Sequence, residues 1–178
     1  MVKVGILQVT HDFLDVMYVA ARTCYSKQSP VEMGRTAFTR PIRDKQKLVD
    51  QVIGSGHLSI AEHVTISLSI EGIDRATANQ LVRHRLCTFS QQSMRYCDMK
   101  DVEFLIPEDK LTAVQEFRVR ALLMHTKELY NQLVEEGVKK EDARAILPLC
   151  TATNLVMTTL SVALLNTLYR FVVVIVLY

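Results

Sequence analysis

A cluster of cationic and hydrogen-bonding side chains lies in the middle of the chain. The run 80–96 reads QLVRHRLCTFSQQSMRY and contains three arginines, one histidine and no acidic residue. Guanidinium groups bind phosphate bidentately, and serine and glutamine side chains can read a base edge or a ribose. This composition predicts an anion site. The alternative is a solvated helix end, because Arg83 and Arg85 would suit the dipole of a preceding helix, and a lone histidine such as His84 is more often structural.

A second polar cluster, GHLSIAEH, stands upstream at 56–63. His57 and His63 are six residues apart, so they do not share one helix face, and no further ligand set follows; a metal site is therefore disfavoured. We predict instead that Ser59 is a helix N-cap and that Glu62 closes a capping box. A helix N-terminus of this kind could also receive a phosphate.

Arg144 precedes an unusually apolar stretch, since residues 145–169 carry no charge. An unpaired cation there would be costly, so we expect Glu141, Asp142 or a ligand anion to meet it. The stretch is long enough to span a bilayer. Its threonines and asparagines favour a buried core helix beginning at Pro148 over a membrane anchor.

The spacing of apolar residues predicts the elements that position these clusters. We expect strands over 2–9 and 65–70, and helices over 12–23, 45–53, 74–83 and 111–136, the third capped by Asp74. Residues 26–41 contain two prolines and are expected to form a functional polar loop. The absence of repeats and linkers predicts a single α/β or α+β unit.

Composition limits the classes to which the protein can belong. The chain has 178 residues, of which 49% are apolar and 22% charged, which excludes a disordered protein. A net charge of +2 is too small to argue by itself for binding to nucleic acid or a membrane surface. Four dispersed cysteines without zinc-site spacing, and no secretion signal, predict a cytoplasmic protein.

Together these motifs resemble the flavin-dependent thymidylate synthases. The family signature, RHR followed by seven residues and then S, is complete at 83–93 and continues into Arg95 and Tyr96. ARTCYS at 21–26, GHLSIAEH at 56–63 and ARAILP at 143–148 resemble further family motifs in the same order. The resemblance covers about residues 1–158.

The resemblance implies a single domain over 1–178, with a central, mostly antiparallel sheet flanked by helices. It implies reductive methylation of dUMP to dTMP with FAD, NADPH and methylenetetrahydrofolate, in a cytoplasmic homotetramer without nucleic-acid or membrane partners. The implied FAD contacts are Ser59, Arg83, His84, Arg85 and Gln91. The implied dUMP contacts are Gln80, Arg83, Gln91, Gln92, Ser93, Met94, Arg95 and Arg144.

The C-terminal part departs from the family pattern after Thr158. Family members carry Asn-x-Arg there, and later an arginine that activates dUMP, whereas this chain has Leu160-Ser161-Val162 and then Phe171. We therefore assign no catalytic residue, and expect a domain truncated or altered after about residue 158 and impaired catalysis. The alternative function is an inactive nucleotide- or RNA-binding protein that uses the cluster at 83–95.

A frameshift is our hypothesis for this departure. Codons for residues 171–177, read one base earlier, permit Arg-Cys-Cys-Asn-Arg-Ala, which is common in the family at this point. The same frame permits an arginine across Val162 and Ala163. The nucleotide sequence around codons 158–162 tests this hypothesis, which fails if no single-base change there restores the family pattern.

Overall fold

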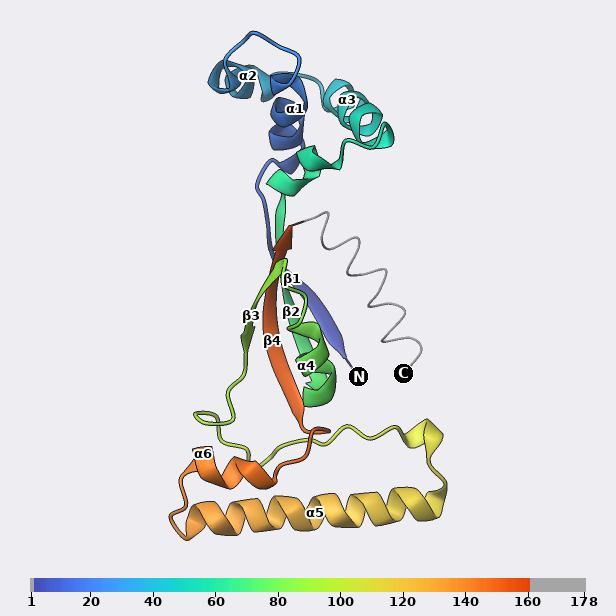
Figure 1. Cartoon of the computed structure of the whole chain (residues 1–178), viewed down its shortest axis with the longest axis vertical. Helices are drawn as coiled ribbons and strands as arrows, with labels where there is room; N and C mark the ends of the chain where they lie inside the picture. Colours follow the sequence, from blue (N-terminus) through green and yellow to red (C-terminus); the bar gives the residue numbers. More distant parts are fainter. Residues whose placement is uncertain (1, 161–178) are drawn as a thin grey trace. The chain divides into compact units, whose positions relative to one another are not determined.

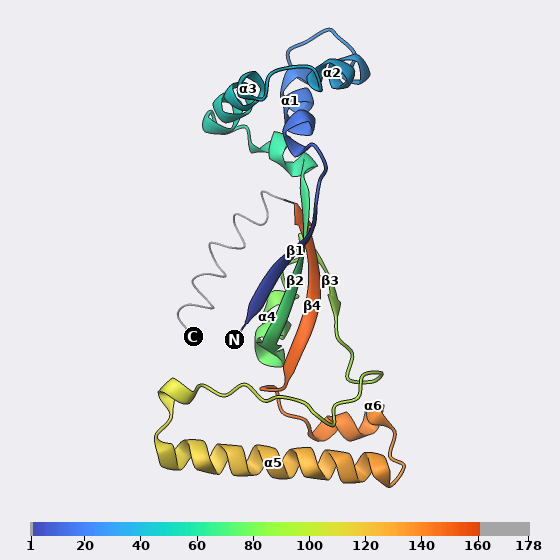
Figure 2. The same cartoon turned by 180° about the vertical axis from the view of Figure 1, so that it is seen from behind.

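A four-stranded sheet runs through the computed structural model, which describes residues 2–160 (Figure 1). The strand order is β1-β2-β4-β3, with bounds Lys3–Val9 (β1), Thr65–Asp74 (β2), Ala152–Leu160 (β4) and Cys87–Gln91 (β3). β2 and β4 are antiparallel, because Ser67 pairs with Thr158 at 2.8 Å whereas Gly72, further along β2, bonds to Asn154. Figure 2 shows the same strands from behind. The predicted α+β class and antiparallel sheet are confirmed.

Strand β4 corrects the helix predicted after Pro148. Side chains along β4 alternate between buried and more exposed positions, with Thr153, Leu155, Met157 and Thr159 buried. A period of two and many threonine and valine side chains suit a pleated strand, and paired strands can bury an uncharged segment as well as a helix can. Within residues 2–160, no helix has the length and apolarity needed to cross a membrane.

Packing divides the described residues into two compact units, and the first comprises residues 5–68, 84–88 and 157–160. Its helices are α1 (Phe13–Thr23), α2 (Pro30–Ala37), α3 (Ile42–Gly54) and the 3-10 helix η1 (Leu58–His63). α1 packs on the other three around Met17, Ala21 and Val49. The amine of Lys45 on α3 forms a buried ion pair with Asp15 on α1.

Helix α2 corrects the prediction of a polar loop over 26–41. Pro30 occupies its first turn, and Ser29 caps it by accepting a hydrogen bond from the Val31 N–H at 3.3 Å. Proline at the first helical position is favourable because its missing N–H has no helical partner to lose. Met33 and Ala37 are the buried residues of this short amphipathic helix.

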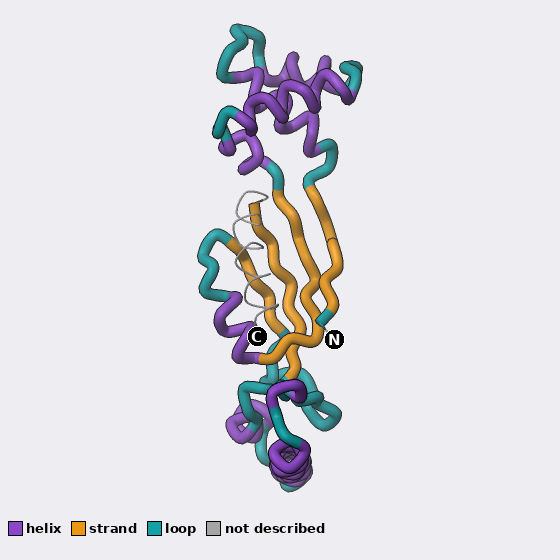
Figure 3. The backbone as a smooth tube through the Cα atoms, turned by 90° about the vertical axis from the view of Figure 1, so that its right-hand side faces the viewer, coloured by secondary structure: helices purple, strands orange, loops and turns teal. Residues whose placement is uncertain are grey.

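Among the described residues, the second unit comprises 2–4, 69–83 and 89–156. It contains α4 (Arg75–Leu81), α5 (Ala113–Glu135), α6 (Lys140–Ala143) and the 3-10 helices η2 (Glu108–Lys110) and η3 (Arg144–Ile146) (Figure 3). Thr112 and Gln115 form a capping box at the start of α5, and Gly137 follows its end with a φ of +94°. The predicted long helix is therefore confirmed, with the glycine supplying the left-handed residue that ends it.

Candidate functional site

Helix α4 positions the first of the predicted site residues. Asp74 caps it as predicted, because its carboxylate accepts from the Thr77 N–H and from the Thr77 hydroxyl, both at 2.7 Å. The helix ends at Leu81, so Gln80 lies in its last turn and Arg83 follows two residues after the end. Both side chains are exposed, which leaves them accessible to a ligand.

The end of β3 and the segment that follows it hold the last part of the family signature against β4. The Gln91 side-chain amide donates to the Thr153 hydroxyl at 3.4 Å, and the Gln92 N–H donates to the Asn154 carbonyl at 2.9 Å. The Ser93 hydroxyl accepts from the Arg95 N–H at 3.2 Å, which makes a tight turn. Met94 packs on the apolar cluster formed by Met99, Val102, Tyr130 and Ala143.

Glu141 on α6 brings Arg95 and Arg144 together. Its carboxylate pairs with the Arg95 guanidinium at 2.9 Å, and its carbonyl accepts from Arg144 Nε at 3.0 Å. The run 80–96 contains no acidic residue, but folding brings to Arg95 a carboxylate from 46 residues away. Arg144 contacts the backbone oxygen of Glu141 and not its carboxylate, and no ion pair within residues 2–160 joins Arg144 to Glu141 or Asp142.

Arg75, which the sequence analysis did not single out, joins this group. Its guanidinium donates to the Gln92 carbonyl at 3.4 Å and to the Thr153 hydroxyl at 3.5 Å. Burial, and next the positive charge of Arg144, lower the pKa of Arg75 from its usual value. Arg75 is the first residue of α4, where a positive charge is unfavourable because it opposes the helix dipole. That unfavourable position was the one feature of the sequence that could have identified Arg75 as a site residue.

The arginine group therefore carries excess positive charge. None of the ion pairs within residues 2–160 includes Arg75 or Arg144, and Glu141 supplies one carboxylate for three guanidinium groups. Two like charges close enough to shift a pKa favour an anion that neutralises them. Arg75, Arg95 and Arg144 are called the arginine group below.

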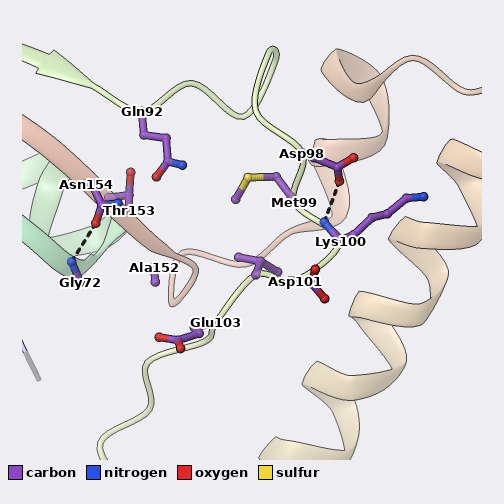
Figure 4. A pocket seen from close by; sticks show the side chains of 11 residues that line it. Gly72, Gln92, Asp98, Met99, Lys100, Asp101, Glu103, Ala152, Thr153 and Asn154 are labelled. Carbon is purple, nitrogen blue, oxygen red and sulfur yellow. Dashed lines mark hydrogen bonds between the residues drawn. The ribbon is translucent and has the colours of Figure 1, made fainter.

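A pocket of about 390 Å³ lies in the same unit, lined by β2, β4 and the loop 98–103 (Figure 4). Asn154 accepts from the Gly72 N–H at 3.0 Å, where Gly72 has a φ of +69° and the buried side of β2 shifts by one residue between Ile70 and Ile73. The pocket lining includes three carboxylates: Asp98, Asp101 and Glu103. These carboxylates disfavour an anion in this pocket, whereas the arginine group favours one.

Three predicted cofactor-binding residues lie in the other unit. Arg85 is exposed and His84 is half-buried. Ser59 is exposed inside η1 and is not its N-cap; His57 occupies that position, and no side chain caps the helix. The predicted capping box is wrong because Gly56, with a positive φ, turns the chain so that η1 begins before Ser59.

The two predicted ligand sets are thus distributed differently. All eight residues predicted to contact dUMP fall in the unit that contains α4, α5 and α6. The five residues predicted to contact FAD divide, with Arg83 and Gln91 in that unit and Ser59, His84 and Arg85 in the other. Among residues 2–160, no group of three or more His, Cys, Asp or Glu side chains is arranged to hold a metal ion.

Residues 5–170 match the family model described as thymidylate synthase complementing protein. The chain belongs to this family. The match includes the whole signature at 83–93 and every residue of the arginine group.

Curated relatives of the chain carry the name flavin-dependent thymidylate synthase. The relative from Geobacter sulfurreducens is 33% identical over 160 residues, covering 88% of this chain and 67% of its own length. Relatives from Thermococcus onnurineus and Pyrococcus furiosus are each 36% identical, over 88% and 89% of this chain and 65% and 66% of their own. The chain therefore spans about two thirds of the length of these relatives.

Proposed function

We propose that this chain is a flavin-dependent thymidylate synthase subunit that methylates dUMP to dTMP. Methylenetetrahydrofolate would supply the carbon, and NADPH the reducing equivalents. The observation that carries the proposal is the arginine group, which folding gathers beside Gln91, Gln92 and Ser93, the residues of the family signature. A nucleoside monophosphate suits this arrangement because it combines a doubly charged anion with a base and a ribose.

The dUMP phosphate would lie on the cationic side of the site. Arg95 and Ser93 supply donors there, and Arg144 and Arg75 supply charge that Glu141 does not neutralise. The exposed side chains of Gln80, Arg83 and Gln92 would bind the ribose and the base of dUMP. Met94 packs into the core and would shape the wall of the site instead of donating hydrogen bonds.

The residues assigned to FAD suit the two phosphates of a dinucleotide. Arg83 and Arg85 are exposed, and neither takes part in the ion pairs found within residues 2–160. Ser59 offers an exposed hydroxyl. When bound, the reduced flavin supplies the hydride of the reductive methylation, so the work of these side chains is binding, orientation and charge compensation.

The remaining parts of the proposal concern the whole protein. We propose a cytoplasmic homotetramer built from one domain over 1–178, altered after about residue 158. Val162 and Phe171, where the family pattern is lost, lie outside the described residues. The frameshift proposal is tested on the gene: it fails if no single-base change restores the family pattern.

The first experiment is a visible absorbance spectrum of the purified chain with added FAD, followed by dUMP-dependent tritium release from the pyrimidine C5 position. Retained flavin with tritium release supports the synthase and an active tail. Retained flavin without release supports the binding sites and the impairment. Absence of flavin binding, together with RNA binding, would support the alternative RNA-binding function.

Variants make the test specific to the assigned residues. Arg83→Ala and Arg85→Ala should weaken FAD binding, whereas Arg95→Ala should weaken dUMP binding with less effect on flavin. Arg43→Ala, an exposed arginine on α3 outside the proposed sites, is the matched control. Equal losses in the control and the site variants would contradict the assignment.

A further inference from the structure

Three buried threonines lie on β4 or directly before it, and their hydroxyls have different kinds of partner. Thr151 donates to the Pro148 carbonyl at 2.6 Å, and Thr159 donates to the Leu160 carbonyl at 3.3 Å. Both hydroxyls are therefore satisfied by backbone oxygens close by along the chain. Thr153 differs, because its hydroxyl accepts from side chains that are 62 and 78 residues away. Its contacts thus join distant elements instead of completing a local turn.

The Thr153 hydroxyl connects two elements of the nucleotide site. Gln91, the last residue of β3, donates to it through the side-chain amide at 3.4 Å. Arg75, the first residue of α4, donates to it through the guanidinium at 3.5 Å. Backbone groups support the same arrangement, because Arg75 also donates to the Gln92 carbonyl, and the Gln92 N–H donates to the Asn154 carbonyl. One position on β4 therefore touches both the cationic side and the amide side of the site.

The place of Thr153 in the sheet does not by itself require a hydroxyl. Thr153, Leu155 and Met157 follow one another along the buried side of β4, and Thr153 is 2% exposed. Valine has nearly the same shape, suits a strand as well, and avoids the cost of burying a hydroxyl. The two donors that the hydroxyl accepts are therefore the physical reason for a polar side chain at this position.

We propose that Thr153 is a positioning residue of the nucleotide site, and that its hydroxyl fixes the side chains of Arg75 and Gln91 before dUMP binds. The inference rests on the proposed function, in which Arg75 supplies charge to the phosphate and Gln91 contacts the nucleotide. A long side chain that is already fixed loses less conformational freedom when the ligand arrives, so the ligand binds more tightly. Without the hydroxyl, both side chains donate to water, and dUMP binding has to order them.

Two substitutions separate the hydroxyl of Thr153 from its packing. Thr153→Val keeps the shape and removes the hydroxyl, and should weaken dUMP binding about fivefold or more in isothermal titration calorimetry. Thr153→Ser keeps the hydroxyl and should bind dUMP as tightly as the wild-type chain. Serine lacks a buried methyl group, so this variant should have the lower midpoint of urea denaturation of the two. The weaker binder is then the more stable variant, an order that a purely structural role would not produce.

Thr159→Val is the matched control on the same strand. Thr159 is also 2% exposed, and the same substitution removes a hydroxyl that bonds only to backbone within the part of the chain that the structure describes. This variant should leave the affinity for dUMP unchanged. Equal weakening in Thr159→Val and Thr153→Val would overturn the proposal, because any lost hydroxyl on β4 would then have the same effect.

Inorganic phosphate tests the contact with Arg75 separately. Thr153→Val should weaken phosphate binding several-fold in equilibrium dialysis. The same substitution should have no effect in an Arg75→Met background, because the side chain that Thr153 positions is then absent. Equal effects in the two backgrounds would overturn the proposal. A Thr153→Val variant that binds dUMP as tightly as the wild-type chain would also overturn it, as would a Thr153→Ser variant that binds as weakly as Thr153→Val.

These measurements also distinguish a failure of this inference from a failure of the proposed function. A wild-type chain that binds phosphate but not dUMP would contradict the proposed function. The comparison of phosphate binding in the two backgrounds would then still decide for or against Thr153. A wild-type chain that binds neither ligand would overturn both.

Discussion

Arg75 is a guanidinium held where positive charge is already in excess. Burial and the charge of Arg144 lower its pKa, and its hydrogen bonds at 3.4 and 3.5 Å are long. We predict that Arg75→Met weakens dUMP binding about tenfold or more, the loss expected for a hydrogen bond to a charged group. The free energy of unfolding should stay within about 1 kcal/mol, because the side chain is only partly buried and repulsion is relieved.

Isothermal titration calorimetry and urea denaturation of the same samples check this prediction. Arg75→Lys separates charge from geometry, since lysine keeps the charge but not the planar fork. Loss of stability without loss of binding would show that Arg75 is structural.

Glu141 competes with any anion for Arg95. Its carboxylate and the Arg95 guanidinium are both about half exposed, so the ion pair itself contributes little to folding. We predict that Glu141→Gln changes the free energy of unfolding by less than about 1 kcal/mol and tightens binding of inorganic phosphate several-fold, because a negative charge leaves the site. Equilibrium dialysis with labelled phosphate measures the phosphate affinity. Weaker phosphate binding in the variant would show that Glu141 orients Arg95.

Helix α4 depends on its N-cap. Asp74 satisfies the Thr77 N–H, one of the four N–H groups without an intrahelical partner at the start of a helix. Asp74→Ala should lower the free energy of unfolding by about 1 kcal/mol, measured by urea denaturation. Asp74→Asn should keep most of the wild-type stability, because asparagine is also a good N-cap. Equal losses in both variants would indicate that the charge, not the cap, stabilises the helix.

The contact between α1 and α3 contains a charge pair that is largely removed from water. Side-chain exposure is 7% for Lys45 and 13% for Asp15. Lys45→Met should lower the free energy of unfolding by about 3 kcal/mol, because the carboxylate then loses its buried partner. The double variant Lys45→Met/Asp15→Leu should recover much of that loss, and thermal and urea denaturation would show it. A double variant less stable than the single would contradict this explanation.

The charge of the whole molecule distinguishes a nucleotide enzyme from an RNA-binding protein. With a net charge of +2, little counterion release is available to bind a phosphate backbone non-specifically. We predict that labelled single-stranded RNA binds no tighter than about 10⁻⁴ M at physiological salt, by fluorescence anisotropy. Micromolar binding that disappears in the Arg83→Ala/Arg85→Ala variant would favour the RNA-binding alternative.

Elements whose signals are local were predictable from the sequence. Alternation identified β1 and β2, helical spacing identified α1, α3 and α5, and the cap at Asp74 was recognised from residue type alone. Local signals failed where two structures suit the same residues. The uncharged threonine-rich segment after Pro148 suits a core helix or a central strand, and the neighbouring strands of the sheet decided for β4.

By itself, the sequence determined the family and which side chains could bind an anion, because both depend on residue types at fixed spacing along the chain. Only the tertiary structure decided which of them meet. Arg75, Gln92, Glu141 and Thr153 are far apart in sequence, and their contacts arise when β4 and α6 pack beside the signature segment. Such pairings depend on how distant elements pack, which no spacing within a single segment encodes.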